Sequence, residues 1–411
     1  MSHVLHPEIR VARQHGAMEY SEPPCDLDAV RRYRLGRVRQ ALRERDYAGA
    51  LLFDPLNTRY VTDSTDMQMW CMHNEVRYVW VSTDGPVVLF EFHNCAHLSE
   101  GLPTVDEVRP TSPFLFFLAG DRYQEKARGW AAEIVDLAHR HGGGNRRIAV
   151  DRVNHLGVRL LRDAGYEIFD GFELMEHARS IKSGGEVALM REAIRVCELG
   201  MTAMHEALEP GITENALWAK LHETNSALGG EWIETRILSS GPRTNPWFRE
   251  SSLRVIEKGD MVSFDTDLVG PYGYCSDISR SWICGDVAPT PEQRDLHALA
   301  LEQIACNTEL VRPGASTREI AENAWKIPDR FVANRYGVVM HGVGLCDEYP
   351  SVKHAMDFDV RGYDAVLQPG MIMCVESYMG AEGGHEGVKL EEQVLVTETG
   401  YEPLSTYPLD L

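Results

Sequence analysis

The sequence lacks any apolar run close to the ~20 residues that a bilayer-spanning helix needs. Residues 1–16 are polar and basic without an apolar central stretch, so no secretion signal is expected there. Cysteine is sparse and odd in number, nine in 411 residues, and no two cysteines form a C-x-x-C pair. We therefore expect reduced thiols in a cytosolic protein, and neither a disulfide framework nor a zinc ribbon.

Basic residues are also fewer than acidic ones. Lys and Arg total 41 against 62 for Asp and Glu, which gives a formal net charge of -21. Such a surface repels phosphate backbones and anionic lipid heads, so we expect neither nucleic-acid nor membrane partners. Small molecules or other proteins remain as candidates, and the length is sufficient for two domains.

The first half of the chain alternates between helical and strand-like patterns. Helices are expected over residues 31–45 and 122–141, and strands over residues 50–53, 78–82, 86–92 and 148–151. Asp84-Gly85 is a hairpin signal between two of these strands. The glycines at 142–144 close a helix before a strand, so they indicate a turn and not a phosphate-binding loop. This half is expected to be an α/β domain of residues 1–181.

A second domain is expected over residues 182–411. Long helices are expected over 186–207 and 213–228, with Thr213 as the N-cap of the second. Strands, two further helices and more strands follow. Helices segregated from an antiparallel sheet indicate an α+β domain.

Acidic residues and one histidine stand in or directly after apolar, strand-like runs of this second domain. They are Asp265, Asp267, Asp277, His341, Glu376 and Glu391. Carboxylates are costly to bury unpaired, and the sequence offers no Arg or Lys for each, although Lys389 could pair with one. Shared cations solve this problem. An oxygen-rich set with one nitrogen ligand suits two divalent first-row ions about 3.5–4 Å apart. Taken singly, a strand-end aspartate is more often a turn cap than a ligand, and the joint pattern is what indicates metal.

On these residues the chain resembles the creatinase and metallo-aminopeptidase superfamily, which has the pita-bread fold. The matching segments are Ile181-Lys182-Ser183, Gly241-Pro242, Gly259-Asp260, residues 273–280, His341 to Gly344, and Val388 to Glu391. The resemblance implies an N-terminal creatinase-like domain, a C-terminal pita-bread domain with a di-metal site, and a homodimer. It also implies the metal ligands Asp265, Asp277, His341, Glu376 and Glu391.

The chain departs from the peptidases of that superfamily at three places. The peptidases space their two ligand aspartates one position more closely, so Asp267 falls where they usually have glycine and is either an added ligand or a solvated turn residue. Two histidines that handle the scissile group in peptidases are replaced here by Trp247-Phe248 and by Asp347. Peptide hydrolysis is hard to support without them.

One branch of the superfamily fits these departures, namely the dimethylsulfoniopropionate lyases. The similar features are Asp265 with Asp267, His341 followed by Asp347, and the stretch from Met67 to Asn74. The branch cleaves its sulfonium substrate into dimethyl sulfide and acrylate, and it suggests iron as the metal. The ligand types also allow manganese, cobalt or zinc.

The elimination requires a base for the proton next to the substrate's carboxylate and a way to stabilise the charge that develops. Asp347 beside His341 is the expected base, a role that burial would favour; a loop aspartate is the alternative. A sulfonium favours an aromatic lining worth roughly 0.5–2 kcal/mol per contact. The candidates are Tyr336, Trp70, Trp247 and Phe248, each of which could instead be a core residue.

Two other functions stay open. The first is a metallo-aminopeptidase or X-Pro dipeptidase of the same fold, and it is disfavoured because this chain lacks the two histidines described above. A non-catalytic module that binds a peptide in the pita-bread cleft should have lost metal ligands, yet all of them are present.

Overall fold

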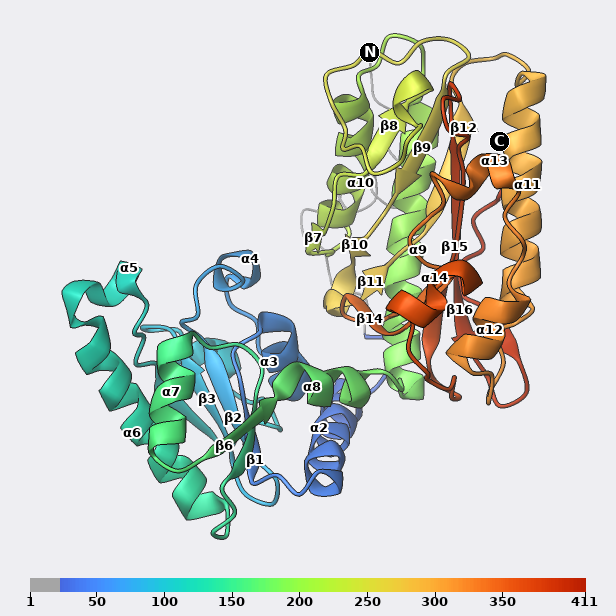
Figure 1. The fold of residues 1–411 in the computed structure, drawn as a ribbon. Helices are drawn as coiled ribbons and strands as arrows, with labels where there is room; N and C mark the ends of the chain where they lie inside the picture. The colour runs from blue at the N-terminus through green and yellow to red at the C-terminus, as the bar shows by residue number, and fades with distance from the viewer. Residues whose placement is uncertain (1–22) are drawn as a thin grey trace. The chain divides into compact units, whose positions relative to one another are not determined.

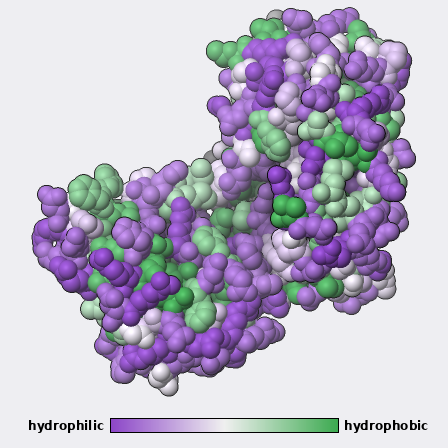
Figure 2. Space-filling view, viewed as in Figure 1, coloured by the Kyte–Doolittle hydropathy of each residue, from purple (hydrophilic) through white to green (hydrophobic). Residues whose placement is uncertain are grey.

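The computed structural model describes residues 23–411 of the chain. They form two compact units, an N-terminal unit of Asp26–Arg179 and a C-terminal unit of Ser180–Leu411 together with residues 23–25. Hydrophilic side chains cover most of the visible face of each unit (Figure 2). Among the helices described, none combines the length and the apolar character needed to cross a membrane.

The N-terminal unit is built on a mixed sheet with the strand order β4-β3-β2-β1-β5-β6 (Figure 1). The strands are β1 (Gly49–Leu52), β2 (Tyr78–Ser82), β3 (Val87–Glu91), β4 (Glu107–Pro110), β5 (Arg147–Val150) and β6 (Glu167–Asp170). β2 and β3 are antiparallel with Val81 opposite Val87, which confirms the predicted hairpin. β1, β5 and β6 run parallel to one another.

Helices lie on both faces of this sheet, with α6 and α7 on one side and α2 and α8 on the other (Figure 1). The helices are α2 (Leu27–Glu44), α3 (Pro55–Thr62), α4 (Gln68–Cys71), α5 (Phe116–Ala119), α6 (Tyr123–His141), α7 (His155–Asp163) and α8 (Gly171–Arg179). α2 begins four residues before the predicted start, because Asp26 caps it by accepting from the backbone N–H of Ala29.

The C-terminal unit contains three antiparallel sheets. One has the order β11-β10-β7, one β12-β9-β8, and the largest β14-β13-β15-β16-β17. The strands are β7 (Trp232–Ile233), β8 (Leu238–Ser240), β9 (Met261–Asp265), β10 (Leu268–Val269), β11 (Cys275–Ser276), β12 (Ser279–Ile283), β13 (Met340–Val343), β14 (Asp347–Val352), β15 (Ile372–Met379), β16 (Val388–Val396) and β17 (Tyr401–Pro403).

The helices of the C-terminal unit precede or interrupt these strands. They are α9 (Gly184–Ala207), α10 (Glu214–Ala227), α11 (Pro291–Thr308), α12 (Thr317–Asn323), α13 (Asp329–Val332) and α14 (Ala355–Arg361). Thr213 is the N-cap of α10, as predicted, and its side chain accepts from Ala216 N. The alternation in the first unit and the antiparallel sheets of the second confirm the predicted α+β class.

The two long central strands of the largest sheet separate an apolar face from a polar one. Met373 and Val375 of β15, with Val388 and Leu390 of β16, belong to one hydrophobic core that includes Leu296, Ala300 and Ile304 of α11. Because successive side chains alternate between the faces of a strand, the intervening residues face the other way. Those residues include Cys374, Glu376, Lys389 and Glu391, all of which are buried.

Candidate metal centre

The six candidate ligands come from four strands and two links between strands. Asp265 ends β9, Asp267 lies in the turn to β10, and Asp277 lies between β11 and β12. His341, Glu376 and Glu391 belong to β13, β15 and β16. Five of the six belong to two groups that share Asp277, and within each group the donor atoms lie within 4.8 Å of one another. The sixth, Glu376, contacts His341 of the first group at 3.3 Å.

The pairing of β15 with β16 places two carboxylates face to face. Glu376 lies directly opposite Glu391, and both side chains are 1% exposed or less. Like charges directly opposite each other destabilise a sheet, and burial removes the water that would screen them. A cation bound between the two carboxylates would remove this repulsion.

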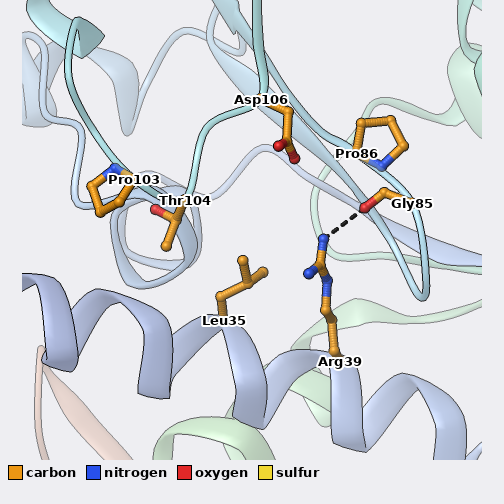
Figure 3. Close-up of a pocket in the computed structure, with 7 residues that line it drawn as sticks. All are labelled: Leu35, Arg39, Gly85, Pro86, Pro103, Thr104 and Asp106. Carbon is orange, nitrogen blue, oxygen red and sulfur yellow. Dashed lines mark hydrogen bonds between the residues drawn. The ribbon is translucent and has the colours of Figure 1, made fainter.

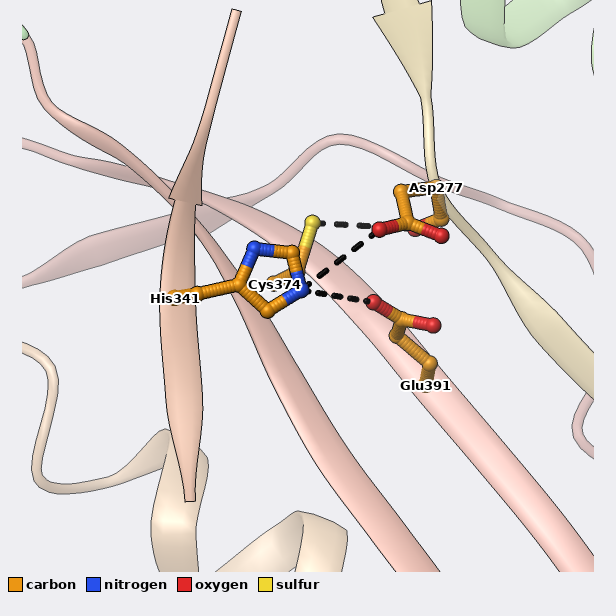
Figure 4. A group of neighbouring side chains, drawn as sticks. All are labelled: Asp277, His341, Cys374 and Glu391. Atoms are coloured by element: carbon orange, nitrogen blue, oxygen red, sulfur yellow. Dashed lines mark hydrogen bonds and ion pairs between the residues drawn. The ribbon is translucent and has the colours of Figure 1, made fainter. Parts of the chain in front are cut away.

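The orientation of His341 indicates where one cation would bind. Its Nδ1 lies 3.0 Å from the carbonyl oxygen of Gly342, which can only accept, so Nδ1 carries the hydrogen. In the neutral ring, Nε2 then has a lone pair. Nε2 faces carboxylate oxygens of Asp277 at 3.5 Å and Glu391 at 3.7 Å (Figure 4). A carboxylate oxygen of Glu376 lies 3.3 Å from the same nitrogen. A lone pair surrounded by carboxylates is repulsive unless a cation, either a metal ion or one proton, lies between them.

Lys389 contacts the other side of the same cluster. Its side chain is fully buried, and its Nζ lies 2.6 Å from Glu376, 3.0 Å from Glu391 and 3.2 Å from Asp265. The sequence suggested one partner for this lysine, whereas the structure gives it three. One ammonium against five carboxylates leaves four negative charges, which equals the charge of two divalent ions.

The carboxylates in this cluster are poorly compensated by the protein alone. Burial, followed by the charge of Glu391, raises the pKa of Glu376 to about 7. Burial likewise raises the pKa of Asp265 to about 6 and that of Asp277 well above its usual range. One buried oxygen each of Asp277 and Glu391 has no hydrogen-bond donor among the described residues. These residues therefore fit the two divalent metal ions that the sequence predicts.

Asp267 lies in a strained turn next to this cluster. Its φ of 37° is in the left-handed region, which is uncommon for residues other than glycine. Its carboxylate accepts a hydrogen bond of 2.5 Å from the Thr235 hydroxyl. One carboxylate oxygen each of Asp265, Asp267 and Asp277 lie within 4.8 Å of one another. The turn thus directs Asp267 toward the cluster, and its role as a ligand stays a prediction.

Asp347 lies at the edge of the cluster. It is the first residue of β14, and its Oδ1 lies 3.6 Å from His341 Nδ1. Its side chain is 65% exposed in this chain, so the burial that would favour a base is not found here. The proximity to His341 agrees with the predicted neighbourhood.

Three of the four predicted aromatic residues lie together. The rings of Phe248 and Tyr336 stack with centroids 5.4 Å apart, and Trp247 lies 6.5 Å from Phe248. Lys389 Nζ lies 4.7 Å from the Tyr336 centroid, which joins these rings to the carboxylates. Phe248 has a φ of 68° and is 59% exposed, so its ring is held at the surface by a strained backbone.

Trp70 is the fourth predicted aromatic residue, and it belongs to the N-terminal unit. Its ring packs edge-on against Phe92 at 5.7 Å. Its contact with substrate stays a prediction.

One residue near the cluster was missed by sequence reasoning. Cys374 lies two positions before Glu376 on β15, so both side chains point to the same face. Its sulfur belongs to the same group of potential ligands as Asp277, His341 and Glu391 (Figure 4). Side chains two positions apart in a strand share a face, so the prediction of Glu376 as a ligand could also have identified Cys374.

A hollow of about 350 Å³ in the N-terminal unit is unrelated to these residues (Figure 3). Its charged side chains already bind backbone atoms. Arg39 donates to the carbonyl of Gly85, and Asp106 accepts from Val87 N. None of the candidate ligands lines it.

Comparisons with known proteins identify the family of the chain. Residues 188–398 match the model of metallopeptidase family M24. The dimethylsulfoniopropionate lyase DddP of Roseovarius nubinhibens is 46% identical over 94% of this chain and 87% of its own length. The DddP of Roseobacter denitrificans is 45% identical over the same shares.

Solved structures support the fold. The Xaa-Pro dipeptidase from Bacillus anthracis aligns with a TM-score of 0.73 at 22% identity, over 93% of this chain and 99% of that chain. The prolidase from Pyrococcus furiosus aligns with a TM-score of 0.70 at 21% identity, over 90% and 99%. The expected pita-bread fold is confirmed. The chain therefore belongs to metallopeptidase family M24 and, within that fold, to the family of the dimethylsulfoniopropionate lyases DddP.

Proposed function

We propose that this protein is a metal-dependent carbon–sulfur lyase that converts dimethylsulfoniopropionate into dimethyl sulfide and acrylate. The observation that supports this most is the similarity, over nearly the whole chain, to two lyases with that activity. The site agrees with it, because a carboxylate and aromatic rings stand where a peptidase would need histidines.

We assign the metal ligands to Asp265, Asp267, Asp277, His341, Glu376 and Glu391. Two divalent ions held there would polarise the substrate's carboxylate and stabilise the negative charge that develops beside it. Iron is our proposed metal, and manganese, cobalt and zinc are compatible with the same ligand types. Elemental analysis of the purified protein tests this assignment.

Asp347 is our proposed base. Its carboxylate would take the proton from the carbon next to the substrate's carboxylate, and the electrons of that C–H bond would form the carbon–carbon double bond. The C–S bond breaks, and its electron pair leaves with neutral dimethyl sulfide. The proton held by Asp347 then passes to water, which restores the base.

The aromatic residues are proposed to hold the sulfonium end. The ring of Tyr336 already lies 4.7 Å from the ammonium of Lys389, so it is placed to face positive charge. Phe248 extends the same surface, and Trp247 supports it from a buried position. Trp70 would complete the lining if the N-terminal unit of a partner chain reaches the site.

Proton NMR on the purified, iron-loaded protein tests the proposal. Vinyl signals of acrylate should appear as the substrate methylene signals disappear, in equal amounts. His341→Ala should lose bound metal together with activity, because it removes the only nitrogen ligand. If protein that contains two metal ions per chain forms no acrylate, the proposed lyase activity is wrong.

An Xaa-Pro dipeptidase is the second candidate, favoured by the peptidases among the solved structures of this fold. Incubation of the same preparation with Xaa-Pro dipeptides distinguishes it, since release of free proline is expected only from a peptidase. We expect none, because the chain has Phe248 and Asp347 at the places of the two histidines.

We further propose a cytoplasmic homodimer with a division into residues 1–181 and 182–411. The superfamily resemblance supports the dimer, and the nine cysteines without paired spacing support a reducing compartment.

A further inference from the structure

The strand that supplies Glu376 also directs a buried sulfur at the metal centre. Cys374 is fully buried and lies directly opposite His341 in the antiparallel pairing of β13 with β15. It shares a face of β15 with Glu376, because the two residues are two positions apart. Its sulfur is thus fixed by the same backbone that fixes two of the candidate ligands.

The surrounding donor atoms form a set that a single ion could bind. The sulfur of Cys374, a ring nitrogen of His341 and one carboxylate oxygen each of Asp277 and Glu391 lie within 4.8 Å of one another (Figure 4). Bonds of about 2.3 Å to sulfur and 2.0–2.2 Å to oxygen or nitrogen allow two donors on one ion to be at most about 4.5 Å apart. Neighbouring donors in a tetrahedral site lie about 3.6 Å apart, so binding would draw these side chains inward by up to about an ångström.

Two buried carboxylate oxygens also indicate that a cation binds beside the sulfur. Within residues 23–411, Oδ1 of Asp277 and Oε1 of Glu391 have no hydrogen-bond donor, although these residues are only 2% and 0% exposed. Buried carboxylate oxygens without a donor are costly and are satisfied when they coordinate a cation. Both of these residues belong to the group that contains the sulfur.

A plain structural role for the thiol is the competing explanation. The sulfur lies 3.8 Å from the backbone carbonyl of Asp277, to which the S–H can donate. That contact is long and the S–H group is a weak donor, so it fixes the sulfur only loosely. The sulfur also lies within 4.8 Å of a donor atom of each of His341, Asp277 and Glu391.

We infer that Cys374 is a thiolate ligand of the metal bound by His341, in addition to the oxygen and nitrogen ligands. The inference rests on the di-metal centre of the proposed function. On binding, the thiol proton is released to water and the S–metal bond takes its place. A soft sulfur donor in an oxygen-rich shell favours Fe²⁺, Co²⁺ and Zn²⁺ over Mn²⁺ and Mg²⁺. Cys374 would thereby contribute to metal selectivity.

Cobalt substitution tests this ligand without reference to catalysis. The full-length protein is depleted of metal, loaded with Co²⁺, and examined by elemental analysis and by near-ultraviolet absorption. We expect an intense thiolate-to-cobalt charge-transfer band in the wild type. Cys374→Ser should keep its cobalt and lose the band, and Cys374→Ala serves as a second variant should the serine protein fail to fold.

Cys284→Ser is the matched control, because Cys284 is a fully buried free thiol of the same unit outside the ligand group. It should retain the band. Competition of Zn²⁺ against Mn²⁺ should also show a loss of preference of about tenfold or more in Cys374→Ser, in the range typical of altered metal shells.

The outcomes distinguish this inference from the proposed function. Two cobalt ions per wild-type chain without the band, or a band that survives in both Cys374 variants, would overturn the thiolate ligand while leaving the metal centre intact. A wild type that binds no cobalt would overturn the metal centre and the thiolate together.

Discussion

Among single residues, Asp347 is the one whose replacement best separates elimination from hydrolysis. Asp347→Asn keeps the shape of the side chain and removes its ability to accept a proton. We expect lyase turnover to fall by ~10²–10⁴-fold, the usual contribution of a positioned general base. Metal content should not change, because Asp347 stands beside the ligand His341 and outside the two ligand groups. Turnover and elemental analysis of the same samples measure both quantities.

Asp359→Asn is the control for that substitution, since Asp359 is a 91%-exposed aspartate of the same unit on α14. It should retain wild-type turnover. Wild-type turnover by Asp347→Asn would contradict its role as the base and direct the search to Tyr336.

Lys389 gives a prediction about stability. Lys389→Met removes a buried ammonium from three carboxylates, which leaves their charge uncompensated. Breaking one side of a buried ion pair costs about 3–5 kcal/mol. We expect that loss in the free energy of unfolding, measured by denaturant titration with a chelator present.

The exposed residue Lys326 supplies the comparison, and Lys326→Met should change stability by less than about 0.5 kcal/mol. Equal unfolding free energies for Lys389→Met and the wild type would show that the cluster does not depend on this lysine for charge balance.

The ligand residues could be predicted from the sequence because acidic residues in apolar strand-like runs form a local pattern. The three carboxylate partners of Lys389 and the placement of Cys374 opposite His341 could not be predicted in this way. Both depend on the pairing of β15 with β16 and with β13, and that register is a long-range property of the sheet. The exposure of Asp347 likewise depends on how β14 continues from the turn before it.

At the scale of elements, the close approach of β13 and β14 holds His341 and Asp347 together. The pairing shifts between His341 and Gly342, and a Cβ added at Gly342 would lie 2.6 Å from the carbonyl oxygen of Tyr349. Gly342→Ala should therefore push the two strands apart. We expect a loss of about 1–3 kcal/mol in unfolding free energy, as for overpacking, and lower lyase turnover.

Gly337→Ala is the corresponding control, because a Cβ at Gly337 meets nothing within 4 Å. It should behave as wild type in both assays. If Gly342→Ala were as stable and as active as Gly337→Ala, the close approach of the strands would not be what positions the site.

Element positions followed largely from local signals. Thr213 begins α10 where a capping residue predicts it, and the β2–β3 hairpin forms around Asp84-Gly85. The early start of α2 was missed because the cap at Asp26 precedes the clear helical pattern. Which strands share a sheet was not predictable, since the C-terminal unit pairs β10 with β7 across more than thirty intervening residues.

At the scale of the whole molecule, the expected homodimer is open to direct measurement. Light scattering after gel filtration should give a mass about twice that of the 46.3 kDa chain. Trp70→Ala should then weaken substrate binding while leaving metal content unchanged, because the N-terminal unit of one chain would serve the site of its partner. A single-chain mass at every concentration would contradict this arrangement.

The central claim is that the metal-containing protein cleaves a carbon–sulfur bond. Head-space gas chromatography over the purified protein and dimethylsulfoniopropionate tests it most directly. We predict that dimethyl sulfide accumulates, that a chelator stops its release, and that returning iron restores it. Protein that contains two metal ions per chain and releases no dimethyl sulfide would contradict the account.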